Sequence, residues 1–402
     1  MRQIRFSAVV VSMLLWGCGG ASPADPSFPG TSPRESSNPT ATSGLSRGSG
    51  ADDSALTLGR HSVIFQYAGQ NDLIHGVAGD ARLVFVAEPL VQAVVVLDRF
   101  TGKEVGRLPA PSVGFALPFT LRTPRPGRLV VLDAGGFPNP FVPSVPRIYD
   151  YDYQYDAFRH RFTASISRTV RLDGLPIVFA EDLEVLDDGT YVMSESIIGA
   201  LWLIHPDSTV TPALFPDNPG VPLPQLGGCP LAPLTIGGVP FAPGFAPGVG
   251  TMATRGGQLY FASSCLGGIY RIPVAALSDP TRSPAARATS IVTVSARPDG
   301  VIEALEGPSF DRFSPASPWL YVGDPFHLQL LRINVDTGAR EVVSSDAQLF
   351  NFSIATTFLP PILGVHTLVV SSDQEYRLAQ LNPGIPTDMF VPPFLLTKID
   401  SW

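Results

Sequence analysis

Residues 181–195 read Glu-Asp-Leu-Glu-Val-Leu-Asp-Asp-Gly-Thr-Tyr-Val-Met-Ser-Glu. Two short apolar runs flank an Asp-Asp-Gly turn, and the second run ends on an acidic residue. Runs of this length on either side of a glycine turn are typical of antiparallel strands joined by a tight connection. A further apolar run at 200–204 adds a third strand, so the segment predicts one small antiparallel sheet.

The same order of strand, turn, strand and strand recurs along the chain after residue 60, giving six units. Their second strands are centred on Val84, Leu129, Tyr191, Tyr260, Tyr321 and Leu368. Repeated units of about four short antiparallel strands are typical of β-propeller blades. The sequence therefore predicts an all-β fold, a six-bladed β-propeller formed by residues 56–402.

The last unit and the start of the chain decide how the ring closes. In the last unit we expect strands at 353–355, 366–371 and 376–381. The segment His61–Tyr67 precedes the first unit and has no partner there. We expect it to complete the last blade, where it covers an exposed strand edge.

Charge and composition exclude some functions. Only 15% of the residues are charged and the net charge is −8, so the chain offers no basic stripe for nucleic acid. After the apolar run near the N-terminus the sequence has no second long apolar run, so we expect no membrane-spanning segment in the rest of the chain. We also expect the protein to be a monomer.

The N-terminus has the pattern of an export signal. Arg2 and Arg5 precede an apolar run over residues 6–15, and Cys18 follows Gly17. This resembles a bacterial lipoprotein signal peptide, residues 1–18, in which Cys18 is lipidated. By the same resemblance Gly19 favours the outer membrane, on its periplasmic or its outer side. The alternative is an ordinary secretory signal.

Residues 19–55 are nearly all Gly, Ser, Pro, Ala, Thr and Asp. Such a segment cannot bury enough apolar surface to offset its ordering entropy, so it predicts a flexible, disordered tether. In an exported protein, Cys229 and Cys265 are expected to form a disulfide. The alternative is two free buried thiols.

The six-unit pattern, and the segment 181–195 above all, resembles the superfamily of the senescence marker protein/gluconolactonase family, the strictosidine synthase-like proteins and the NHL repeats. The resemblance covers most of the chain after residue 60. It implies a divalent metal, usually calcium, in the central channel. In the lactonase branch Glu, Asn and Asp side chains at the starts of inner strands hold this metal.

The matching positions of this chain carry candidate metal ligands, namely Glu181, Asp182, Glu306 and Asn351. Together they offer calcium a set of hard oxygen ligands. The chain departs from the family at Val249-Gly250, where the family often has an Asn followed by Gly. The alternative is that Glu181 and Glu306 bond backbone amides or line a solvated channel.

Hydrolysis of a lactone needs a Lewis acid on the carbonyl group and a base for water. Glu181, Glu306 and Asp324 are the candidate bases, and His75 is a candidate proton carrier. The alternative for His75 is an ordinary channel residue. Two functions stay open: a metal-dependent hydrolase of lactones or esters resembling gluconolactonase, or a non-catalytic propeller. The second would bind a small molecule, a polysaccharide or a protein of the cell envelope.

The stretch Tyr149–Asp156 alternates tyrosines with polar residues. On a strand the four tyrosines share one face. This face is either a stacking wall for a ligand or a packing surface against the neighbouring blade.

Overall fold

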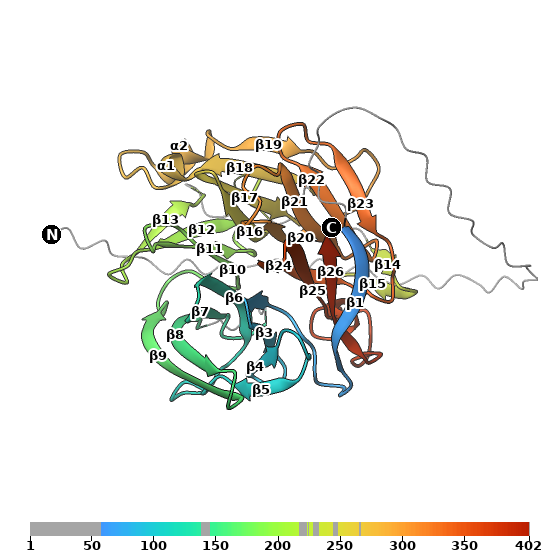
Figure 1. The fold of residues 1–402 in the computed structure, drawn as a ribbon. Helices are drawn as coiled ribbons and strands as arrows, with labels where there is room; N and C mark the ends of the chain where they lie inside the picture. Colours follow the sequence, from blue (N-terminus) through green and yellow to red (C-terminus); the bar gives the residue numbers. More distant parts are fainter. Residues whose placement is uncertain are drawn as a thin grey trace, which may run out of the picture. The chain divides into compact units, whose positions relative to one another are not determined.

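Six four-stranded antiparallel sheets follow one another along the chain in the computed structural model of the protein (Figure 1). The structure describes residues 58–137, 145–216, 223, 225–227, 233–243, 248–264 and 267–401. The predictions on Cys18, the segment 19–55 and the pair Cys229 and Cys265 lie outside these residues. Among the described helices none has the length and apolar character of a membrane span.

Each blade consists of four strands. Blade 1 contains β2 (Val77–Gly79), β3 (Leu83–Glu88), β4 (Ala93–Asp98) and β5 (Glu104–Arg107), and blade 2 contains β6 (Pro118–Arg125), β7 (Arg128–Asp133), β8 (Arg147–Asp156) and β9 (Arg161–Arg171). Blade 3 contains β10 (Ala180–Val185), β11 (Tyr191–Glu195), β12 (Ala200–Ile204) and β13 (Val210–Leu214), and blade 4 contains β16 (Val249–Arg255), β17 (Gln258–Ser263), β18 (Ile269–Pro273) and β19 (Val292–Ser295). Blade 5 contains β20 (Glu306–Phe310), β21 (Trp319–Asp324), β22 (Gln329–Asn334) and β23 (Arg340–Ser344), and blade 6 contains β24 (Ser353–Ile362), β25 (Val365–Ser372), β26 (Phe394–Ser401) and β1 (Leu58–Tyr67).

A separate apolar cluster fills each gap between neighbouring blades, including the gap between blades 6 and 1. Side chains of a strand alternate between its two faces. In β3, Leu83 and Phe85 therefore pack against blade 2, whereas Val84 and Val86 pack against blade 6. Both faces are buried, which explains the continuous apolar runs of the second strands. The predicted six-bladed propeller is confirmed.

Short elements lie outside the blades. They are the hairpin of β14 (Leu234–Ile236) and β15 (Val239–Phe241), the helices α1 (Val274–Leu277) and α2 (Pro284–Ala288), and the 3₁₀ helix η1 (Glu375–Arg377).

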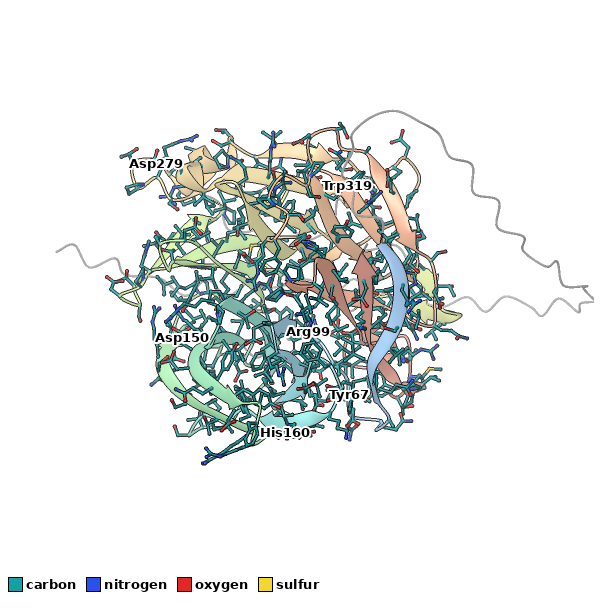
Figure 2. The ribbon with its side chains drawn as sticks, in the orientation of Figure 1. Tyr67, Arg99, Asp150, His160, Asp279 and Trp319 are labelled. Atoms are coloured by element: carbon teal, nitrogen blue, oxygen red, sulfur yellow. The ribbon has the colours of Figure 1, made fainter. Side chains whose placement is uncertain are left out.

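The ring closes through β1, which pairs antiparallel with β26 from Leu58 opposite Ser401 to Tyr67 opposite Phe394. The predicted role of His61–Tyr67 is thus confirmed. Arg99, labelled in Figure 2, adds a polar contact across the seam: its guanidinium donates from blade 1 to the Pro360 carbonyl of blade 6 at 2.6 Å.

The strand predicted at 376–381 is wrong, because β26 is the third strand of blade 6 and η1 occupies residues 375–377. Gln374 has a left-handed backbone conformation (φ 62°), which breaks the extended path after β25. Asp373 Oδ1 then accepts a hydrogen bond from the Glu375 amide at 3.0 Å. This turn directs Glu375 toward the channel.

The tyrosines of β8 pack on the neighbouring blade. Tyr149, Tyr151 and Tyr153 are buried in the cluster between blades 1 and 2. The ring of Tyr153 lies 4.9 Å from that of Phe85 in an edge-to-face arrangement. The structure thus places this tyrosine face as a packing surface.

Removal of residues 1–67 is expected to lower the Tm by on the order of 10 °C relative to removal of residues 1–57. The longer truncation removes β1 with Tyr67 and exposes the edge of β26. Calorimetry measures the Tm, and size-exclusion chromatography detects association through the edge. Equal Tm values for the two truncations would show that β1 is dispensable for closure.

Candidate functional site

A cavity of about 90 Å³ lies at the end of the channel where the inner strands begin. Its walls are aromatic, formed by Phe119, Phe137, Phe179, Phe241, Phe326 and Phe352. Its polar lining contains His75, Glu181, Glu306 and Glu375. An apolar wall around a few convergent polar groups is the usual construction of a small-molecule site.

Three carboxylates from three blades line this cavity, and Asp373 lies beside one of them, Glu375. Glu181 lies near the start of β10, Glu306 begins β20, and Asp373 and Glu375 follow β25. Glu306 accepts hydrogen bonds from Thr251 Oγ1 at 3.2 Å and Ser264 Oγ at 3.0 Å. Glu375 Oε1 and Asp373 Oδ2 are buried and have no hydrogen-bond donor among the described residues.

Irregular pairing at the starts of inner strands aims these side chains. The register of β10 with β11 shifts between Ala180 and Leu183, and that of β20 with β21 shifts between Glu306 and Ser309. A bulge bends a strand and re-aims its side chains. It allows neighbouring residues such as Glu181 and Asp182 to point their side chains into different environments.

Burial and mutual repulsion raise the pKa values of all four carboxylates. Burial, reinforced by nearby carboxylates, raises the pKa of Glu306 and that of Glu375 to about 8. Burial raises the pKa of Glu181, with Glu306 adding to the effect, and burial with Glu375 raises that of Asp373. Among the described residues no Lys or Arg forms an ion pair with any of the four. The negative charge of these carboxylates must therefore be neutralised by bound protons or by a bound cation.

His75 is held neutral beside the carboxylates. Burial lowers its pKa to about 3, and its ring stacks on Phe119 with centroids 3.4 Å apart. Nδ1 lies 3.2 Å from the Phe119 carbonyl oxygen, which only accepts, so we assign the proton to Nδ1. The lone pair of Nε2 then faces Glu375 Oε1 at 3.7 Å. A histidine oriented in this way through a carbonyl is arranged as a metal ligand.

His75, Asp373 and Glu375 form one group whose ligand atoms all lie within 4.8 Å of one another. Gly250 provides space beside it. A Cβ atom at Gly250 would lie 3.2 Å from Glu306 Oε2 and 3.3 Å from Glu181 Oε1. Gly250 thus leaves a gap between the carboxylates of Glu306 and Glu181.

The other predicted ligands lie elsewhere. Arg122 Nη2 donates to Asp182 at 2.7 and 2.9 Å, and the Met252 amide donates to Asp182 Oδ2 at 2.6 Å. Asn351 Oδ1 accepts from the Tyr376 hydroxyl at 3.0 Å. The structure brings together Glu181, Glu306 and His75 of the predicted residues, and it does not bring Asp182 or Asn351 to the cavity.

Asp324, the other candidate base, ends β21 and accepts from His327 Nδ1 at 2.8 Å. It does not line the aromatic cavity.

Sequence reasoning missed Asp373 and Glu375. A signal exists, because second strands of other blades also end near an acidic residue. Asp133 accepts from the amides of Ala116 and Leu117, and Glu195 accepts from those of Val178 and Phe179. Asp373 holds the same position in blade 6 but has one oxygen left over for the channel.

A hairpin covers part of the cavity and forms its roof. Phe241 of the hairpin β14–β15 lies in its wall. Asn382 is fully buried; its Nδ2 donates to the Pro240 carbonyl at 2.8 Å and to the Tyr376 carbonyl at 2.9 Å. This one amide ties the hairpin to the segment after η1.

Comparison with known proteins confirms the kind of fold. No family model matches the chain, and no curated protein matches it. Among solved structures, a protein of unknown function from Bacteroides thetaiotaomicron has a TM-score of 0.52 at 11% identity, covering 85% of this chain and 76% of its own. A gluconolactonase from Xanthomonas campestris has a TM-score of 0.49 at 13% identity, covering 87% of this chain and 92% of its own. A calcium-binding regucalcin from Agrobacterium tumefaciens has a TM-score of 0.47 at 14% identity, covering 84% of this chain and 94% of its own. At these identities the similarity concerns the fold.

Without a divalent cation, the stability of the protein is expected to fall as the pH rises from about 4.5 to 8. Glu306 and Glu375 keep their protons in the folded state up to pKa values of about 8, whereas the ordinary value is 4.5. In this window the folded state binds more protons than the unfolded state, so raising the pH favours unfolding. Thermal unfolding in EDTA between pH 5 and 8.5 measures the slope.

Glu306→Gln, a neutral isostere, is expected to flatten this slope and to raise the Tm in EDTA at pH 8. Glu104→Gln on the exposed strand β5 serves as the matched control with an unchanged slope. A Tm that rises with pH in EDTA would contradict the assignment.

Proposed function

We propose that the protein is a hydrolase of small apolar lactones or esters that uses a divalent cation such as calcium. The observation that carries the proposal is the convergence of Glu181, Glu306 and Glu375 on one aromatic cavity, with the buried Asp373 beside Glu375. Among the described residues, none of the four pairs with a cationic Lys or Arg side chain. Oxygen donors of this kind suit calcium.

The residues present fit such an ion. Two buried carboxylate oxygens, on Asp373 and Glu375, have no donor among the described residues, and the missing side chain of Gly250 leaves room beside Glu181 and Glu306. Glu306, Asp373 and Glu375 would hold the ion, with Nε2 of His75 as a further ligand. When bound, it would polarise a carbonyl group and lower the pKa of water.

The chain itself supplies binding, orientation and a base. The phenylalanine walls bind the apolar part of the substrate and limit the contact of the reacting group with water, and Asn382 holds the roof in place. Glu181 takes a proton from the attacking water as the oxygen adds to the carbonyl carbon. The C–O bond of the ester then breaks, and the leaving oxygen receives the proton. His75 stays neutral near pH 7, so it contributes as a ligand and not as a proton carrier.

A second candidate is binding without turnover. The cavity of about 90 Å³ is smaller than the roughly 300 Å³ at which drug-sized ligand pockets begin, and its roof is fixed by Asn382. A retained small ligand, or an ion that stabilises the ring, also suits this closed arrangement.

The place of action follows from the sequence alone and remains part of the proposal. The run before Cys18 and the composition of residues 19–55 support an exported protein with a lipid on Cys18 and a tether. Its substrate or partner would then be found in the cell envelope or outside the cell.

Calcium is expected to raise the Tm, because a ligand that binds the folded state stabilises it by about 2.7 kcal/mol at a hundredfold excess over its Kd. Glu306→Gln should abolish most of the shift, and Glu104→Gln should retain it. A panel of lactones and short aryl esters then tests turnover, with kcat/KM about 100-fold lower in Glu181→Gln. A calcium shift without turnover favours the second candidate, and no shift contradicts the cation site.

Gly250→Ala is expected to weaken calcium binding about tenfold, because the new methyl group would lie 3.2 to 3.3 Å from oxygens of Glu306 and Glu181. The Tm in EDTA serves as the internal control and should change little. Titration followed by calorimetry measures the affinity. Unchanged affinity would show that the ion does not use the gap at Gly250.

A further inference from the structure

A second, larger cavity of about 740 Å³ lies where the inner strands end, lined by the hairpins that join first and second strands. An ionic layer lies between it and the acidic cavity. Arg122 Nη2 donates to Asp182, its Nε donates to Glu184 at 3.1 Å, and Asp182 is almost fully buried. The channel therefore has two chambers with different chemistry.

Five arginines line the larger chamber: Arg122, Arg125, Arg128, Arg255 and Arg312. Arg122 and Arg128 are occupied, the first by Asp182 and Glu184 and the second by Asp150 at 3.0 Å. Among the described residues, no carboxylate lies within ion-pair distance of the other three, Arg125, Arg255 and Arg312.

Backbone carbonyls hold two of these three in place. Arg312 of blade 5 reaches across the channel and donates from Nη1 to the Thr123 carbonyl of blade 2 at 3.0 Å. Blades 2 and 5 lie opposite each other in the ring. Arg255 donates from Nη2 to the Pro315 carbonyl at 2.9 Å, and its guanidinium carbon lies 5.3 Å from the Phe310 ring centroid.

A guanidinium has five N–H donors in a fixed plane. Because one of them binds a carbonyl in each case, Arg312 and Arg255 are oriented while their other donors stay available to a ligand in the chamber. Part of the ordering cost of a ligand site is thus met before binding.

The acidic groups of this chamber make their contacts with other partners or lie at its rim. Glu184 is taken by Arg122 and by Thr254 Oγ1, and Asp311 is paired with His366 Nδ1 at 2.6 Å. Asp188 Oδ1 accepts from the Thr190 amide, while Asp187 is exposed at the rim. These contacts do not remove the charge of the carboxylates, but among the described residues none of them pairs directly with Arg125, Arg255 or Arg312.

We infer that this chamber is a second binding site, for a small organic dicarboxylate held by Arg312 and Arg255, with Arg125 at the rim. The flat guanidinium fork matches the two oxygens of a carboxylate. Two oriented guanidinium groups from different blades fit an anion with two carboxylates. The apolar lining, including Leu121, Phe310 and Phe358, accommodates its carbon skeleton.

Succinate is the probe, titrated by calorimetry into calcium-saturated protein at pH 7 and low ionic strength. We expect saturable binding at one site, weakened about tenfold by Arg312→Gln and by Arg255→Gln. Arg312→Lys, which keeps the charge but not the fork, should bind with intermediate affinity. Arg107→Gln is the matched control, because Arg107 pairs with Glu104 on the outer strand β5 and should leave the affinity unchanged.

Two further variants locate the ligand. The side chain of Arg125 makes no hydrogen bond or ion pair within the described residues, so Arg125→Gln should weaken binding without an effect on the Tm. Glu306→Gln in the other chamber should leave succinate binding intact.

Three results would overturn the inference. They are absence of saturable binding, equal affinity in wild type and Arg312→Gln, and loss of succinate binding in Glu306→Gln. Tighter binding of inorganic phosphate than of succinate would overturn the assignment to a carboxylate.

Discussion

The pairing of β1 with β26 is the constraint on which the rest of the structure depends. It turns a row of six sheets into a ring and places blade 6 beside blade 1. The Ser371 hydroxyl then donates to the His75 carbonyl at 2.6 Å, and His75 faces Glu375 across the same seam. The part of the candidate site formed by His75, Asp373 and Glu375 is thus assembled from both ends of the propeller.

A second constraint follows from closure, because six inner strands directed at one axis bring their first residues together. Where those residues are Glu181 and Glu306, like charges are forced into a space from which water is largely removed. The chain separates this layer from the arginines beyond it through one salt-bridge network around Arg122. Opposite chemistry therefore develops at the two ends of the same strands.

The fold was predictable from the sequence, because strands buried on both faces consist of apolar runs and the turns between them contain Asp and Gly. Glu181 and Glu306 were predictable as channel residues because each begins an inner strand. Asp373 had a signal in the acidic residues that end other second strands. Glu375 had none, because the left-handed turn at Gln374 that aims it is a tertiary feature. Asp182 shows a further limit of prediction from sequence. Because of the bulge in β10, its carboxylate binds Arg122, whereas the neighbouring Glu181 faces the cavity. Gly250 has no side chain that could bind a metal, yet the space it leaves beside Glu306 and Glu181 suits an ion.

The seam between blades 6 and 1 also has a consequence for the order of folding. His75 and Glu375 belong to opposite ends of the propeller, so their imidazole and carboxylate groups stay hydrated while most blades form. The cost of removing water from them arises when blade 6 docks against blade 1. An ion that binds at this seam would offset that cost and stabilise the closed ring. The ion concentration in the compartment where the chain matures would then set how firmly the ring stays closed.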